Sequence, residues 1–178
     1  KPHQISRLGI GRTFQIVRPC QNLEVETNVR VAFGHRVYPS LWKSTEPFRQ
    51  PDILKEVQTL VEKAGLLPYT KQVAKNLPLG FKKRLEIARA LALRPRLLLL
   101  DEPSAGLRFE ESAQLMELIR QVRDQGIGVL LIEHNMHVVM DLCKRIVVLD
   151  HGSKIAEGSP EGIRSNSLVI QAYLGKEA

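Results

Sequence analysis

The chain has 178 residues, a length that suits one domain with its own hydrophobic core. Apolar residues make up 43% of it and charged residues 25%, proportions that exclude a disordered chain. No apolar stretch approaches the ~20 residues that span a bilayer. The two cysteines, Cys20 and Cys143, are too few for a disulfide-stabilised secreted domain, so a reducing compartment is expected.

The formal net charge of +7 raises the question of a nucleic-acid partner. The cations, however, are scattered, and the tightest cluster, at residues 82–84, falls within a helical pattern. Aromatic residues make up only 5% of the chain, which leaves few side chains to stack on bases. We therefore expect no nucleic-acid partner and favour a small anionic ligand or an acidic protein surface.

In chain order, the first half of the sequence predicts mainly helices. An extended segment at residues 10–14 precedes helical patterns at 24–35 and 52–64, which a proline-containing irregular stretch separates. A further helix at 81–93 carries one apolar stripe and ends at Pro95. A helical region is therefore predicted between the extended segment and the rest of the fold.

The second half predicts alternating strands and helices. Apolar runs at 97–100, 128–132 and 146–149 are typical of strands buried on both faces. A helix is expected at 108–123, and Asn135 is a plausible cap for another. A tight turn at 150–152 leads to an extended segment at 154–156, and a helical tail starts at Pro160. This order predicts an α/β fold in which the three strands form a parallel sheet covered by helices.

Asp101, Glu102 and Pro103 directly follow the first apolar run. In open parallel sheets, ligands bind beyond the carboxyl ends of the strands. There Asp101 could hold a hydrated Mg²⁺, and Glu102 could orient an attacking water. Taken alone, the same pattern also fits a solvated acidic turn.

Three other features carry weaker signals. Gly80 stands just before the helix predicted from Phe81, where backbone N–H groups can bind phosphate or simply form a capping turn. His134 follows the second apolar run and could donate to a phosphate, pair with His137 on a metal, or be inert. Gln15 by itself carries almost no information.

The order and spacing of these four features along the chain are more informative than any one of them alone. Gln15, residues 77–80, the apolar strand ending at Glu102, and His134 resemble the Q-loop, signature, Walker B and switch-histidine motifs of ABC transporter ATPase subunits. The resemblance is greatest to the branched-chain amino-acid subfamily. It rests on segments 9–15, 76–80, 84–91, 156–158 and 172–175 and covers essentially the whole chain.

The resemblance implies a P-loop NTPase-like ABC ATPase fold with a parallel sheet core and an inserted helical subdomain. The Q-loop segment would be residues 9–16 and the helical subdomain about 20–93. The Walker B, D-loop and H-switch core would be 96–158, and the family tail 159–178. The implied activity is ATP binding and hydrolysis in an importer, for branched-chain amino acids or a related polar substrate.

The resemblance also assigns roles to individual residues. Glu102 would act on the water, His134 would stabilise the transferring phosphoryl group, and Gln15 would contact Mg²⁺ or the water. Asp101 would support Mg²⁺. The signature segment would face the ATP held by a second ATPase subunit, and its residues are Leu77, Pro78, Leu79, Gly80 and Phe81.

The implied ligands are ATP and Mg²⁺. The implied partners are a second ATPase subunit, transmembrane permease subunits and, indirectly, a substrate-binding protein. The protein would be peripheral, at the cytoplasmic face of the plasma membrane, with no transmembrane segment of its own.

The sequence departs from the family pattern in several places. No Gly-x-x-x-x-Gly-Lys-[Ser/Thr] loop occurs in the 178 residues, and in the family this phosphate-binding loop precedes the Q-loop. We therefore expect the first strands of the fold to be missing and the isolated chain to be inactive. Arg108 stands where Asp or Asn is usual and Lys82 where Gln is frequent, while Pro78 and Leu79 replace a more widespread Ser-Gly.

Two alternatives remain beside this interpretation. One is a non-enzymatic remnant that at most docks to a membrane subunit. The other is an ABC-type ATPase of DNA repair or chromosome structure. Such proteins carry long coiled coils between Q-loop and signature, whereas only about sixty residues separate Gln15 from Leu77, which disfavours this alternative.

Overall fold

The structure is a computed structural model that describes residues 2–14, 17–37 and 51–174. It divides between residues 132 and 133 into two compact units, which are described separately below.

The first unit is built on a three-stranded parallel sheet. Its strands are β1 (Ile10–Arg12), β2 (Leu97–Asp101) and β3 (Gly128–Ile132), in the order β1-β2-β3. Ile10 lies opposite Leu97 in the register, and Asp101 lies opposite Ile132. The predicted α/β class with a parallel sheet is therefore confirmed. A short helix that the sequence did not predict, α1 (Pro2–Arg7), precedes β1.

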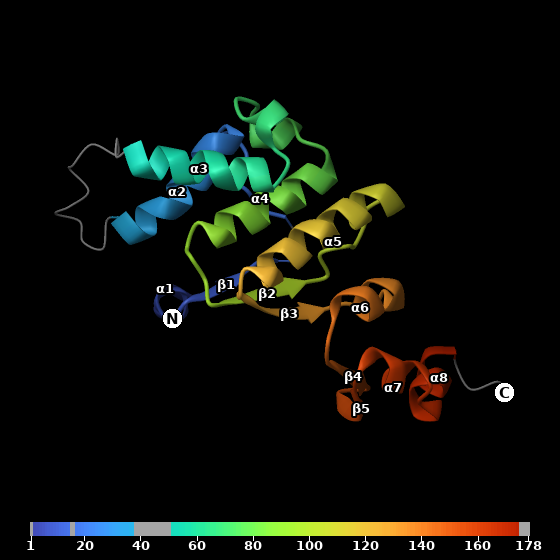
Figure 1. Ribbon diagram of the computed structural model, residues 1–178. Coiled ribbons are helices and arrows are strands. Elements are labelled where there is room, and N and C mark those ends of the chain that lie inside the picture. The colour runs from blue at the N-terminus through green and yellow to red at the C-terminus, as the bar shows by residue number, and fades with distance from the viewer. Residues whose placement is uncertain (1, 15–16, 38–50, 175–178) are drawn as a thin grey trace. The chain divides into compact units, whose positions relative to one another are not determined.

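Between the adjacent strands β1 and β2 the chain forms the predicted helical insertion. It contains α2 (Val25–Val37), α3 (Pro51–Lys63), the 3₁₀ turns η2 (Leu67–Tyr69) and η3 (Ala74–Asn76), and α4 (Leu79–Leu91). The helix α5 (Phe109–Asp124) connects β2 to β3. Figure 1 shows α4 and α5 lying over one face of the sheet.

The signature helix, α4, is the central element of this unit. Its apolar residues Leu85 and Ala88 are fully buried, and it contacts α2, α3, α5 and β1. It begins at Leu79, two residues before the predicted start at Phe81. The reason is that the Lys82 N–H donates to the Pro78 carbonyl at 3.0 Å, which closes a first turn that includes Gly80.

The apolar strands differ in burial. In β2, Leu98 and Leu100 are fully buried, whereas Leu97 and Leu99 are only partly buried, so the predicted burial on both faces holds for one face only. In β3, by contrast, Leu130 is 57% exposed and Ile132 is 59% exposed, so the prediction of a strand buried on both faces is wrong there. The reason is that α4 and α5 lie over one face of the sheet, so the alternate residues of β3 that point to the other face are exposed.

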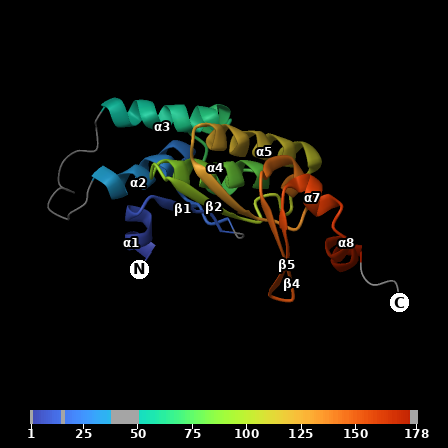
Figure 2. The same ribbon diagram turned by 60° about the horizontal axis from the view of Figure 1, so that its bottom comes forward.

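The second unit is a hairpin with short helices, visible in Figure 2. It contains α6 (Met136–Leu142), β4 (Ile146–Asp150), β5 (Ser153–Gly158), α7 (Pro160–Arg164) and α8 (Ser167–Leu174). The predicted cap at Asn135 and the predicted helical tail are both confirmed. The Asn135 side chain accepts a hydrogen bond from the His137 N–H at 3.1 Å.

The prediction that residues 146–149 join the parallel sheet is wrong. In the structure β4 pairs with β5 in antiparallel fashion. The turn explains this pairing, because His151 and Gly152 both have positive φ (46° and 81°) and thereby form a two-residue hairpin connection. Ile146, Ile163 and Val169 form the core between the hairpin and the two terminal helices. Of the helices that the structure describes, none is both long and apolar enough to cross a membrane.

Candidate functional site

The two predicted catalytic carboxylates lie at the carboxyl end of β2. Asp101 is the last residue of the strand, and its side chain is 30% exposed. Its Oδ2 lies 3.4 Å from Nη2 of Arg12, which ends the neighbouring strand β1. The Arg12 guanidinium also lies 5.2 Å from the centre of the Phe14 ring. Strands β1 and β2 thus place a solvent-accessible carboxylate beside a cation at the edge where ligands bind in parallel sheets.

Glu102 has a left-handed backbone, with φ of 44°. This conformation costs a non-glycine residue on the order of 1 kcal/mol or more. Two hydrogen bonds hold it: the Glu102 N–H donates to the Ile132 carbonyl at 2.9 Å, and the Lys83 ammonium donates to the Glu102 carbonyl at 3.0 Å. Glu102 is therefore tied through its N–H to the end of β3 and through its carbonyl to α4.

Glu86 is a buried carboxylate in the middle of α4, at 9% exposure. Its Oε1 accepts a hydrogen bond from the Arg18 N–H at 2.6 Å. Burial raises the pKa of this carboxyl. Hydrogen bonds from the backbone of Arg18 and Phe14, together with the charges of Arg89 and Lys83, oppose the shift only in part. A small cavity of about 10 Å³ lies beside Glu86, and it is lined by Thr13, Phe14, Lys83, Glu86, Ile87, Asp101 and Pro103.

The signature segment is ordered around the N-terminus of α4. Leu77 is buried and extended, and Pro78 caps the helix without a side-chain hydrogen bond. The first N–H groups of any α-helix lack intrahelical partners, so this end is suited to bind an anion. Gly80 lies in the first turn, and a Cβ on it would sit 3.0 Å from Glu111 Oε1. The ring of Phe81 packs 4.4 Å, centre to centre, from that of Tyr69.

The loop after Glu102 contacts the same helix end. Gly106, with φ of 75°, lies against Leu79, whose Cδ2 would be 3.1 Å from a Cβ on the glycine. Arg108 caps α5, and its N–H donates to Glu111 Oε2 at 3.0 Å. The predicted signature segment and the loop that follows Asp101 and Glu102 therefore share a packed contact.

Two predicted residues are not part of this arrangement as described. Gln15 lies outside the described residues, although its described neighbour Phe14 belongs to the contacts above. His134 belongs to the second unit, where it is exposed and its N–H donates to Glu133 Oε2 at 3.1 Å. Within the described ranges no group of three or more His, Cys, Asp or Glu could hold a metal, so a His134–His137 metal pair gains no support.

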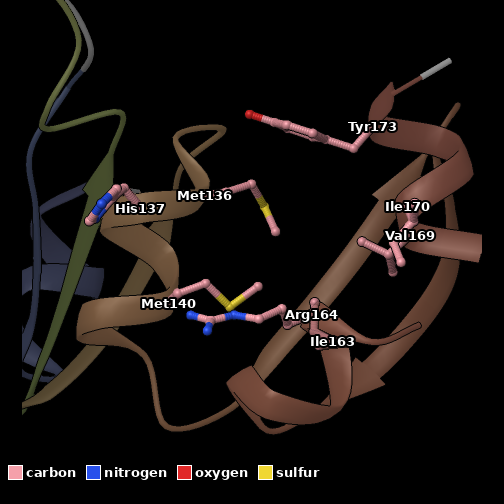
Figure 3. Close-up of a pocket in the computed structure, with 8 residues that line it drawn as sticks. All are labelled: Met136, His137, Met140, Ile163, Arg164, Val169, Ile170 and Tyr173. Atoms are coloured by element: carbon pink, nitrogen blue, oxygen red, sulfur yellow. The ribbon is translucent and has the colours of Figure 1, made fainter. Parts of the chain in front are cut away.

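A larger cavity, of about 320 Å³, lies in the second unit among α6, α7 and α8. Figure 3 shows the Met136 and Met140 side chains directed toward Arg164 and the tail helices, with the Tyr173 ring at one side. Its lining is mostly apolar and includes none of the predicted site residues. This cavity therefore does not mark the predicted chemistry.

Sequence reasoning missed the buried charged groups Lys83 and Glu86 and the partly buried Glu111. A signal for Glu86 was present, because it interrupts an otherwise apolar run at residues 85–88. Lys83 belongs to the basic cluster at 82–84, which gave no indication that it is only 7% exposed. A charge within a buried face is costly unless it is partnered, so it often marks a specific contact.

Comparisons with known proteins decide the family. Residues 1–105, more than half of the chain, match the family described as ABC transporter. The chain belongs to the ABC transporter family. Residues 153–178 also match the family described as branched-chain amino acid ATP-binding cassette transporter.

Individual ABC relatives agree with this assignment. The chain is 42% identical to the high-affinity branched-chain amino acid transport ATP-binding protein LivG of Escherichia coli, over 97% of this chain and 70% of LivG. It is 40% identical to BraF of Pseudomonas aeruginosa, a protein of the same description, over 98% of this chain and 71% of BraF. The solved ABC cassette MJ1267 in its ADP conformation has the same fold, with a TM-score of 0.80 at 24% identity, over 99% of this chain and 72% of that one.

Membership of this family gives the motifs their context. ABC transporter ATP-binding subunits bind and hydrolyse ATP, and the order of motifs that the sequence predicts is the order found in such subunits. The P-loop NTPase-like ABC fold is likewise shared with the solved cassettes.

Proposed function

We propose that the protein is the ATP-hydrolysing subunit of an ABC importer for branched-chain amino acids. The observation that carries this proposal is the match of residues 153–178 to the branched-chain amino acid transporter family, since that segment lies outside the general ABC match. The names of LivG and BraF, at 42% and 40% identity, support the same substrate class.

The geometry at the end of β2 supports the division of roles. Asp101 offers accessible carboxylate oxygens, the donor type that Mg²⁺ prefers, and would hold the ion that accompanies ATP and neutralises phosphate charge. Glu102 would orient and polarise the attacking water, and Gln15 would contact Mg²⁺ or the water. His134 would donate to the transferring phosphoryl group.

The signature segment would contribute to the site of a second subunit. Its helix N-terminus, with the close backbone approach that Gly80 allows, suits the phosphates of an ATP bound by the partner. Residues 77–81 would then bind nucleotide only in the dimer. Permease subunits would receive the resulting movement, and a substrate-binding protein would deliver the amino acid. This assembly would place the protein at the cytoplasmic face of the plasma membrane.

The polypeptide of these 178 residues alone is proposed not to hydrolyse ATP. It contains no Gly-x-x-x-x-Gly-Lys-[Ser/Thr] loop, the element that surrounds the phosphates in this class of ATPase. The same observation keeps a second candidate function open, in which a non-enzymatic protein docks to a membrane subunit.

Reconstitution tests the proposal. The gene product that contains these residues is assembled with its permease subunits in liposomes, and phosphate release is measured with and without leucine-loaded binding protein. We expect stimulation by leucine, and a loss of about 10²-fold or more in kcat for Glu102→Gln, since general bases contribute on that order. ATP hydrolysis that Glu102→Gln leaves intact would refute the role of Glu102. Assembly with the permease but no hydrolysis would favour the docking function.

A further inference from the structure

Three charged residues of α4 lie along one side of the helix at intervals of three: Lys83, Glu86 and Arg89. We call these residues the polar stripe of α4. Lys83 and Glu86 are more than nine-tenths buried, and Arg89 is partly buried. Each of the three side chains forms a hydrogen bond with a backbone group of a segment distant in the sequence, so none of them is simply a solvent-exposed surface charge.

The Lys83 end of the stripe contacts the catalytic strand end. The ammonium donates to the Glu102 carbonyl at 3.0 Å, a main-chain group nineteen positions away in sequence. Because Glu102 has a left-handed φ of 44°, its backbone needs such support to remain in place. Lys83 is therefore positioned to fix where the Glu102 side chain begins.

The other end of the stripe holds the segment that flanks Gln15. Glu86 accepts the Arg18 N–H at 2.6 Å and also interacts with the Phe14 backbone. Arg89 donates to the Arg18 carbonyl at 3.3 Å. Arg18 is thus hydrogen-bonded to α4 through both its N–H and its carbonyl. The carboxylate of Glu86 interacts with the backbone of both Phe14 and Arg18, which precede and follow residues 15–16 in the sequence.

We propose that Glu86, supported by Lys83, is a positioning residue for ATP hydrolysis, fixing the backbone of Phe14, Arg18 and Glu102 to the signature helix. The inference rests on the proposed function of the chain as an ATPase subunit. Glu86 would act through the residues it holds, since its own carboxylate is buried and its hydrogen bonds go to backbone N–H groups. Movement of α4 would therefore also move the backbone of Phe14 and Arg18, which flank Gln15 in the sequence, and the backbone of Glu102.

The experiment compares three variants of the assembled transporter. Glu86→Ala removes the acceptor for both N–H groups, whereas Glu86→Gln keeps one acceptor oxygen and serves as the conservative variant. Val61→Ala, at a buried position of α3 away from the polar stripe, controls for a general loss of packing. ATP hydrolysis gives kcat and KM, and hydrogen exchange of the Phe14 and Arg18 amides reports the contacts directly.

We expect Glu86→Ala to lower kcat by about ten- to a hundredfold, the range for slight misplacement of catalytic groups. KM for ATP should stay within about twofold, because a group that does not touch nucleotide affects the chemical step rather than binding. Glu86→Gln should keep more of the wild-type kcat than Glu86→Ala does. Exchange at Arg18 should accelerate in Glu86→Ala and not in Val61→Ala.

The outcomes separate the inference from the proposed function. Equal kcat values in Glu86→Ala and Val61→Ala, or unchanged exchange at Arg18, would overturn the positioning role. If Glu86→Ala does not fold, the comparison of Glu86→Gln with Val61→Ala decides in the same way. If the wild-type assembly hydrolyses no ATP, the proposed function fails. In that case, slow exchange at Arg18 that depends on Glu86 would still establish the contact. The absence of ATP hydrolysis would rule out a role of that contact in catalysis.

Discussion

The carboxylate of Glu111 occupies the space into which a side chain at Gly80 would extend: a Cβ on Gly80 would lie 3.0 Å from Glu111 Oε1. Glu111 cannot simply move away, because its other oxygen accepts the Arg108 N–H at 3.0 Å. The signature helix is therefore packed against Glu111 in the first turn of α5. This contact makes the glycine a steric requirement at position 80.

Introducing a second carboxylate at this contact tests it. Gly80→Asp should lower the free energy of unfolding by roughly 1–2 kcal/mol, because two carboxylates would meet in a partly buried contact. Glu111→Gln in the same background should restore part of that loss. Urea unfolding of the four proteins of the double-mutant cycle measures the coupling. Additive effects of the two substitutions would show that the side chains do not interact.

Gly106 provides a second packing test with an internal control. Gly106→Ala should destabilise the protein by more than about 1 kcal/mol, because φ is 75° and the new methyl group would press on Leu79. Gly126 also has positive φ, at 86°, but a Cβ added there would meet no described atom within 4 Å. Gly126→Ala should therefore show the backbone penalty alone. Thermal unfolding of both variants measures the difference, and equal losses would mean that the Leu79 contact carries no energy.

Asn28 is fully buried and satisfies several backbone groups at once. Its Oδ1 accepts the Cys20 N–H at 2.8 Å, and its Nδ2 donates at 3.1 Å to the carbonyls of Cys20, Leu23 and Glu24. Asn28→Ala should cost about 1–3 kcal/mol, the range for an orphaned buried group. Asn28→Asp should cost more, since one carboxylate oxygen would face carbonyls. Denaturant midpoints rank the two, and a more stable Asp variant would contradict this network.

Glu86 should make stability depend on pH. Burial raises its pKa in the folded protein above the value of 4.5 expected for an exposed glutamate. In the window above that value the folded state binds more protons than the unfolded state, so stability falls as pH rises through the window. Glu86→Gln should remove this part of the pH dependence. Urea unfolding between pH 4.5 and pH 7 measures it, and profiles of identical slope would show that Glu86 does not titrate in this window.

The sequence determined the element types and the order of the motifs. The apolar runs at 97–100 and 128–132 and the apolar stripe along 81–93 each produced the expected strand or helix. The succession of Gln15, residues 77–80, Glu102 and His134 sufficed to indicate the ABC family. These signals are either local patterns or the order of motifs along the chain, and both can be read from the sequence alone.

Only the tertiary structure decided which segments meet. The run at 146–149 is apolar enough for the parallel sheet, yet a two-residue turn pairs it with β5. Within the basic cluster at 82–84, nothing in the sequence distinguishes the buried Lys83 from an exposed lysine. Glu86 and Arg18 lie 68 positions apart, and their hydrogen bond exists because α4 crosses beside the end of β1. Pairing and burial of charge arise from contacts between distant segments, which periodicity along one segment does not record.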